Sequence, residues 1–111
     1  MTFSPADGAT GVAISSNITI TFNEAMRNTD DSALTNSNID SLITLNDASG
    51  TDIAFDATID ANKKVITIDP TNNLSYSQTV YVAISASVED SSGNPITASS
   101  ATFTAEQYLQ Y

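Results

Sequence analysis

Aspartate side chains are the residues of this chain best suited to chemistry, because neighbouring carboxylates can hold a hard cation such as calcium. Asp30 and Asp31 are adjacent and lie in residues 27–38, the longest stretch without strand periodicity. Two adjacent carboxylates repel each other unless a cation or solvent screens them. Screening by solvent is the simpler interpretation, and a calcium site at Asp30 and Asp31 is the metal hypothesis. Three further carboxylates could join it if the fold brings them close: Asp7, Glu24 and Asp40.

Two other aspartate-rich segments favour turns over metal sites. In residues 90–94, Asp90 can accept hydrogen bonds from backbone N–H groups, while Gly93 or Asn94 takes a positive φ. Residues 47–52 superficially resemble an EF-hand calcium loop, but the glycine comes too early and no glutamate closes the loop. We therefore predict a turn at 90–94 and a hairpin turn at 47–52.

Catalysis is not expected. The chain has no cysteine and no histidine, which removes thiolate nucleophiles, zinc–thiolate sites and the commonest general base. Paired carboxylates can hydrolyse glycosides. However, the sequence offers no tryptophan as a sugar platform and no apolar cleft that would raise the pKa of an acid. We predict that the protein is not an enzyme and needs no cofactor, calcium being the one alternative.

The charge balance excludes two classes of partner. Thirteen acidic residues face only three basic ones, Arg27, Lys63 and Lys64, which gives a formal net charge of −10. Such a surface repels phosphate backbones and anionic lipids, so nucleic acid is excluded and a membrane surface disfavoured. No apolar run approaches the roughly 18 residues that span a bilayer, and direct membrane insertion is not expected.

The elements that would position these residues are strands, because the dominant hydrophobic period is two. Strands are predicted at 12–14, 18–22, 42–45, 53–59, 65–68, 80–88 and 97–104, separated by turn-forming residues. About seven short strands predict an all-β fold, an antiparallel sandwich of two sheets with Greek-key connections. The predicted core is Ile18, Ile20, Phe22, Leu45, Ile66, Ile68, Leu74, Val80, Val82, Ile84 and Phe103.

Two segments favour brief helices, residues 24–28 and residues 36–41. Neither an internal repeat nor a linker is visible, so residues 1–106 are predicted to form one domain and residues 107–111 a tail or the start of a linker. Tyr81 falls on the solvent-facing side of its predicted strand.

Four segments together resemble the bacterial Ig-like domains of S-layer proteins and large surface adhesins. They are residues 4–12 (SPADGATGV), 18–26 (ITITFNEAM), 66–82 (from ITIDP through Leu74 into VYV) and 88–95 (VEDSSGNP), and residues 101–104 (ATFT) resemble the closing strand. The resemblance covers residues 3–104 and implies an Ig-like sandwich without an active site.

The resemblance implies a structural spacer in a multidomain bacterial protein that is secreted or exposed on the cell surface. Its partners would be neighbouring modules of the same chain, and the isolated domain would be monomeric. The alternative is an adhesive module that binds a carbohydrate or a protein through its end loops, with residues 27–38 as the first candidate. In either case calcium at a module junction could stiffen the chain.

Overall fold

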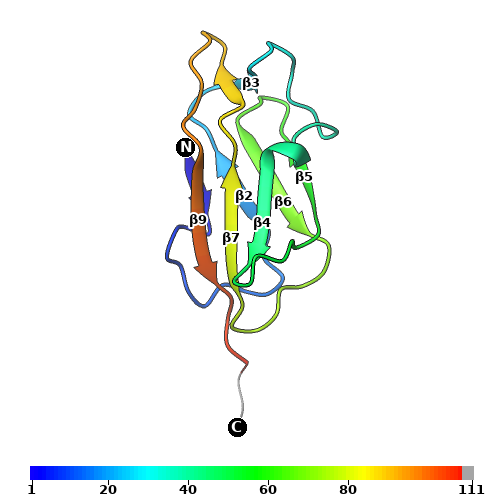
Figure 1. Cartoon of the computed structure of the whole chain (residues 1–111), viewed down its shortest axis with the longest axis vertical. Coiled ribbons are helices and arrows are strands. Elements are labelled where there is room, and N and C mark those ends of the chain that lie inside the picture. Colours follow the sequence, from blue (N-terminus) through cyan, green and yellow to red (C-terminus); the bar gives the residue numbers. More distant parts are fainter. Residues whose placement is uncertain (109–111) are drawn as a thin grey trace.

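The computed structural model describes residues 1–108, which fold into two antiparallel sheets packed face to face with a short ribbon at one end (Figure 1). The strands are β1 Thr2–Ser4, β2 Ile18–Thr21, β3 Met26–Asn28, β4 Ile43–Asp47, β5 Phe55–Ile59, β6 Val65–Pro70, β7 Thr79–Ile84, β8 Val88–Asp90 and β9 Ser99–Thr104. One short 3-10 helix, η1 at Asp40–Leu42, precedes β4.

The strand order identifies the architecture. One sheet has the order β1-β2-β6-β5, the other β4-β7-β9, and β3 pairs with β8 in the ribbon. This is the arrangement of a constant-type immunoglobulin domain, in which four strands face three. The predicted all-β antiparallel sandwich is therefore confirmed.

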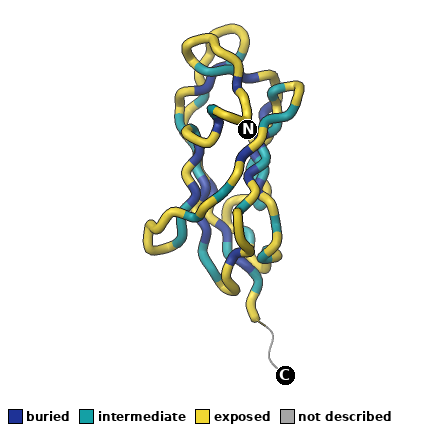
Figure 2. Tube along the Cα trace, turned by 90° about the vertical axis from the view of Figure 1, so that its right-hand side faces the viewer, coloured by how far each residue is buried: buried dark blue, intermediate teal, exposed yellow. Residues whose placement is uncertain are grey.

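The core lies between the two sheets and follows the alternation read from the sequence. Ile18 and Ile20 of β2 pair with Ile68 and Ile66 of β6 and are all fully buried, while the threonines between them are less so. All eleven predicted core residues are buried, and Figure 2 shows the buried positions along the interior of the molecule. The burial of Leu34, Ile39 and Val88 was not predicted.

Three element predictions need correction. Residues 24–28 do not form a helix, because Met26–Asn28 is strand β3, held by β8. The strand predicted at 80–88 is interrupted after Ile84, and the chain passes from one sheet to the ribbon before β8 begins. The strand predicted at 12–14 is reduced to one bridge, between Val12 and Ala105. Local alternation cannot show where a chain leaves one sheet for another.

Other predictions hold in part. Residues 36–41 contain the start of η1. Strands β1 and β3 were not predicted, the strand predicted at 80–88 is divided into β7 and β8, and the one predicted at 12–14 is absent, so the described residues contain nine strands where about seven were expected. Tyr81 is exposed, as predicted. The boundary at residue 106 stays a prediction, and residues 109–111 of the tail lie outside the described part of the chain.

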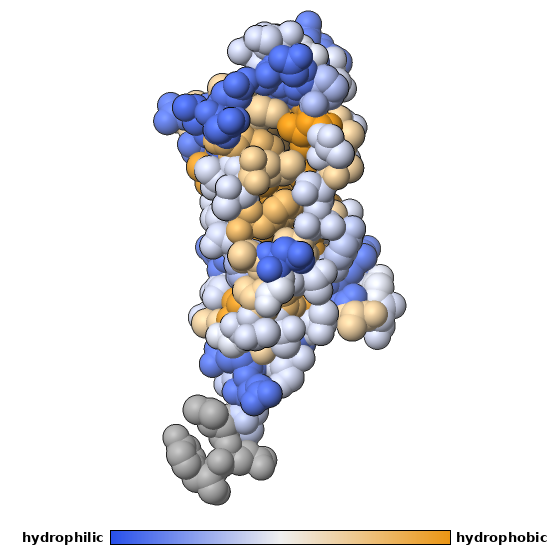
Figure 3. All heavy atoms as spheres, turned by 90° about the vertical axis from the view of Figure 1, so that its left-hand side faces the viewer, coloured by the Kyte–Doolittle hydropathy of each residue, from blue (hydrophilic) through white to orange (hydrophobic). Residues whose placement is uncertain are grey.

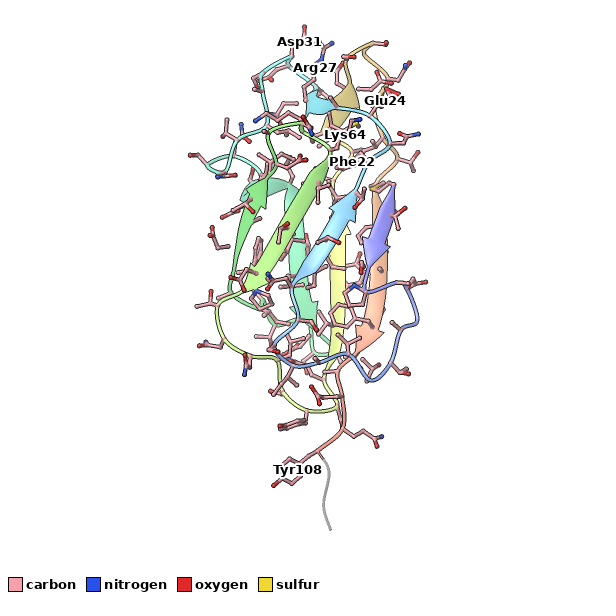
Figure 4. All side chains as sticks on the ribbon, turned by 180° about the vertical axis from the view of Figure 1, so that it is seen from behind. Phe22, Glu24, Arg27, Asp31, Lys64 and Tyr108 are labelled. Atoms are coloured by element: carbon pink, nitrogen blue, oxygen red, sulfur yellow. The ribbon has the colours of Figure 1, made fainter. Side chains whose placement is uncertain are left out.

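The molecule is long and narrow, with extents of 55 × 25 × 23 Å. The N-terminus lies in the upper half of Figure 1, whereas β9 runs to the lower end, where Gln107 and Tyr108 follow. Figure 4 places Tyr108 at the end opposite to Phe22, Glu24 and Arg27. Within residues 1–108, no helix has the length and apolar character needed to cross a membrane.

Candidate functional site

The end of the sandwich that carries β3, β8 and the loops 29–38 and 61–64, here called the ribbon end, holds the most concentrated set of charges. Arg27 Nη2 lies 3.2 Å from Glu89 Oε2 and 3.1 Å from Asp31 Oδ1. The Glu89 side chain is only 8% exposed, so the pairing with Arg27 compensates a charge removed from water. This ion pair fixes β3 against β8 at the centre of the ribbon.

Asp30 and Asp31, the predicted calcium ligands, make separate contacts within this end. Asp31 forms the ion pair with Arg27, and Asp30 accepts hydrogen bonds from the backbone N–H and the hydroxyl of Ser32. The Ser32 hydroxyl and then its N–H lower the pKa of Asp30, because both bonds favour the ionised form. Asp31 has a positive φ of 71°, and its N–H donates to the Asn28 carbonyl in a tight turn.

The three carboxylates considered as further ligands do not join Asp30 and Asp31. Asp7 accepts a hydrogen bond from the Thr102 N–H, Asp40 accepts one from the Ala57 N–H, and Glu24 lies beside Asp90. Within residues 1–108, no group of three or more His, Cys, Asp or Glu side chains could hold a metal ion. Calcium binding at Asp30 and Asp31 stays a prediction.

The 90–94 segment forms the predicted turn. Asp90 Oδ1 accepts hydrogen bonds from the N–H groups of Ser92 and Asn94, both at 2.9 Å, and Gly93 has a φ of +85°. The Asn94 contacts are the first cause that lowers the pKa of Asp90 to about 2. Any side chain at position 93 would be strained by this φ, and its Cβ would lie 3.4 Å from Glu89 Oε2.

The carboxyl groups of Glu24 and Asp90 are neighbours at the ribbon end. Hydrogen bonding to Asp90, and then the charge of Asp90, raise the pKa of Glu24, while hydrogen bonding to Glu24 is a minor cause of the lowered pKa of Asp90. The charge of Lys64 opposes the shift at Glu24. Figure 4 places Glu24 at this end together with Arg27, Asp31 and Lys64.

Residues 47–52 form the predicted hairpin turn. Asp47 Oδ1 accepts hydrogen bonds from Ser49 N–H at 2.9 Å and Thr51 N–H at 3.0 Å. Gly50 takes a φ of +80°, and Asn46 bridges Asp52 across the turn. The aspartate therefore serves the backbone of its own loop.

A second feature, here called the parallel clamp, joins residues 8–12 to β9. Residues 8–12 run parallel to β9, and Val12 bridges Ala105. The clamp contains four backbone hydrogen bonds: Gly8 N–H to Thr102 O (2.7 Å), Thr104 N–H to Ala9 O (2.9 Å), Val12 N–H to Thr104 O (3.3 Å) and Glu106 N–H to Val12 O (2.7 Å).

Two acidic side chains extend the clamp at its ends. Asp7 Oδ1 accepts from the Thr102 N–H at 2.9 Å, and Glu106 Oε2 accepts from the Ile14 N–H at 2.8 Å. Sequence reasoning missed Glu106, since an acid just after the last strand gives no local signal. It also missed Glu89. The only sequence signal for Glu89 is its position next to the apolar Val88, and strand β8, which contains both, is only three residues long.

The sequence profile of the family described as "Bacterial Ig-like domain" matches residues 1–105. Among solved structures, CopC from Methylosinus trichosporium OB3b is similar to this chain in fold, with a TM-score of 0.67 at 16% sequence identity. The similarity covers 100% of this chain and 95% of that one. Among curated proteins there is no match.

Proposed function

Because the chain belongs to the family of bacterial Ig-like domains, we propose that it is a load-bearing spacer module of a secreted or cell-surface bacterial protein. Domains of this family are typically non-catalytic and usually extracytoplasmic, which supports both parts of the proposal. Its partners are then the neighbouring modules of the same protein.

The parallel clamp is the observation that carries the proposal. Residues 8–12 belong to the first segment of the chain and β9 is the last strand, and both run toward the lower end of Figure 1. Tension applied to the two ends of the chain pulls the clamp segments in opposite directions along their length. The four backbone hydrogen bonds are then loaded together, so they must break in one step.

Loading in shear gives a high barrier to forced unfolding, and forced unfolding is governed by the unfolding rate. A spacer that transmits tension needs this kinetic resistance more than it needs a large equilibrium stability. The net charge of −10 also suits a spacer, since it keeps the module soluble and repels other anionic surfaces.

Single-molecule force spectroscopy with attachment at the two termini tests the proposal. We expect the double variant Asp7→Ala/Glu106→Ala to unfold at a clearly lower force, because it removes both side-chain acceptors of the clamp. Asp56→Ala is the matched control, since it removes an exposed acid on β5 outside the clamp. Equal unfolding forces for all three proteins would reject the load-bearing role.

The adhesive alternative stays a prediction. The segment on which it depends, residues 27–38, begins within strand β3 and is anchored by Leu34 and by the adjoining Ile39, which are both 0% exposed. Lys63 Nζ also donates to the Leu34 carbonyl at 2.8 Å. Specific binding of the isolated module to a carbohydrate or protein array, abolished when the loop is replaced, would favour adhesion over the spacer role.

A further inference from the structure

Two exposed tyrosines lie together at the end of the molecule where the chain leaves the sandwich. Tyr76 and Tyr108 are 47% and 63% exposed, and their rings meet edge to face with centroids 5.2 Å apart and an interplanar angle of 73°. Figure 4 places Tyr108 at the tip of this end. An edge-to-face contact is a favourable aromatic geometry, but rings this exposed add little to the core of the sandwich.

Backbone hydrogen bonds bring the segments that carry the two rings together. The Ser77 N–H donates to the Glu106 carbonyl at 2.8 Å, and the Ala105 N–H donates to the Gln78 carbonyl at 2.8 Å. The first of these bonds lies within two residues of each ring. The Glu106 N–H also donates to the Val12 carbonyl at 2.7 Å, so the exit segment is held on both sides. The rings therefore meet because of the fold, although they are far apart in the sequence.

Both phenols are open to reagents in solution. Figure 3 shows that the large apolar area of the face drawn there lies in the upper half of the molecule, whereas the lower end is mostly hydrophilic. Another exposed tyrosine, Tyr81, lies in the middle of β7, where its cross-strand neighbours are Asn46 and Thr102. Within residues 1–108, Tyr76 and Tyr108 are thus the one pair of tyrosines whose rings meet.

We propose that Tyr76 and Tyr108 form a site of oxidative modification, at which a one-electron oxidant of the peroxidase class couples the two rings into dityrosine. Each phenol gives up one electron and its hydroxyl proton, which leaves two neighbouring phenoxyl radicals. The radicals form a bond between one ring carbon next to each oxygen; each of these carbons then loses its hydrogen as a proton, and each oxygen takes up a proton from water. In total two electrons and two protons leave the protein, and they reduce one molecule of hydrogen peroxide to two molecules of water.

Coupling within one molecule is favoured over coupling between two copies. The fold already holds the rings in contact, and groups held in contact react at a high effective concentration. The formal net charge of −10 also repels a second copy of the chain. The new bond therefore closes a loop inside a single module.

The cross-link changes how the module extends after it unfolds. It encloses β7, β8 and β9, so these strands cannot be drawn out by tension on the two ends of the chain. The length released on unfolding falls by roughly 100 Å, at about 3.3–3.6 Å for each enclosed residue. For the proposed spacer this limits the reach of an unfolded module, but the site itself does not depend on the spacer role, because it rests on the contact between the rings.

Oxidation of the dilute protein with hydrogen peroxide and a haem peroxidase tests the site. We expect a monomer with dityrosine fluorescence, an intact mass lower by two hydrogen atoms, and a digest in which Tyr76 and Tyr108 are joined. Tyr76→Phe and Tyr108→Phe keep an aromatic ring but lack the phenol, so each should lose this product. The matched variants Tyr81→Phe and Tyr111→Phe should retain it. Product only in covalent dimers, an unchanged monomer mass, or a cross-link that persists in Tyr76→Phe/Tyr108→Phe overturns the site.

A second comparison tests whether the fold creates the site. The folded protein and the protein unfolded in urea are oxidised with the same light-driven one-electron oxidant, which needs no folded enzyme. The yield of the Tyr76–Tyr108 product should fall at least about tenfold in urea, because unfolding removes the high effective concentration. An equal yield in the two conditions contradicts the proposal. Neither experiment bears on the force measurement of the spacer role, which uses the unmodified module.

Discussion

At the scale of single residues, the neighbouring carboxyl groups of Glu24 and Asp90 have pKa values that are shifted in opposite directions. Asp90 also accepts bonds from the backbone and side chain of Asn94, so its charged form is favoured and its pKa falls from 3.8 to about 2. Glu24 has no such bonds among the causes of its shift, and its pKa is raised. Asp90 therefore serves as the hydrogen-bond acceptor of the turn, whereas the neighbouring Glu24 carboxylate is in a less favourable environment.

Neutralising these two residues should therefore have opposite effects on stability at pH 7. Asp90 contributes stability above its unfolded pKa of 3.8, which is lost as the pH falls toward 2, so Asp90→Asn should destabilise the fold at pH 7 but not near pH 2. Glu24 favours folding only below its ordinary pKa of 4.5, and this contribution to stability is lost as the pH rises through the raised pKa of the folded state. Glu24→Gln should therefore stabilise the fold at pH 7 and make no difference below pH 4.

Urea unfolding of both variants between pH 2 and pH 7 measures these differences. Ser91→Ala, at an exposed position of the same turn, is a suitable control. A loss of stability in Glu24→Gln at pH 7 would mean that Glu24 makes a favourable contact as a carboxylate.

Calcium binding at Asp30 and Asp31 is tested by thermal unfolding with millimolar calcium and with a chelator at equal ionic strength. A ligand that binds only the folded state raises the melting temperature according to its concentration over its dissociation constant. A rise of several degrees that disappears in Asp30→Asn/Asp31→Asn would support the site. Equal melting temperatures with and without calcium would reject it.

At the scale of elements, the 29–38 loop behaves as part of the core because Leu34 is fully buried. Leu34→Ala should reduce the free energy of unfolding by about 2–5 kcal/mol, as is usual for buried leucines. Ser37→Ala, at an exposed position of the same loop, should change it by less than about 0.5 kcal/mol. Chemical denaturation gives both values, and similar small changes for the two variants would show that the loop is not anchored.

The outer edge of β5 is covered by side chains. Asp40 Oδ1 accepts the Ala57 N–H at 3.2 Å, and Asn36 Oδ1 accepts the Ile59 N–H at 2.9 Å. Exposed edge donors invite pairing with another chain. The variant Asn36→Ala/Asp40→Ala should therefore aggregate faster at equal concentration than the wild type, as light scattering would show. Asn72→Ala is the control, and aggregation as slow as that of the control would show that the edge needs no cover.

Sequence patterning predicted the elements best where one sheet contains the whole strand. In β2, β6 and β7 the inward positions alternate without interruption, so the predicted core is confirmed there. Prediction was wrong where the chain changes partner. Residues 24–28 were assigned to a helix, yet Met26–Asn28 is a strand that pairs along its whole length with β8, whose residues lie 60 or more positions later in the chain.

At the scale of the whole molecule, the features that support a function depend on contacts between the two ends of the sequence. The clamp joins Gly8 to Thr102 and Val12 to Glu106, so no local window of sequence contains both partners. The acidic residues illustrate the same limit. Asp7 and Glu106 look like ordinary surface acids in the sequence, and the fold makes them hydrogen-bond acceptors at the two ends of the clamp.

The central claim is that the module resists tension applied along its length. The most direct test compares two pulling directions on the same fold by single-molecule force spectroscopy. One direction uses the termini and loads the clamp in shear; the other uses cysteines introduced at Ser41 and Ser85, which flank the paired ends of β4 and β7, where Ile43 lies opposite Ile84. Because the chain has no native cysteine, attachment is specific.

Pulling at residues 41 and 85 separates β4 from β7 one hydrogen bond at a time, so this direction should need a much lower force. We predict that the terminal direction gives the clearly higher unfolding force, and that Asp7→Ala/Glu106→Ala lowers the force in that direction only. Equal forces in the two directions, or a weaker terminal direction, would contradict a load-bearing role.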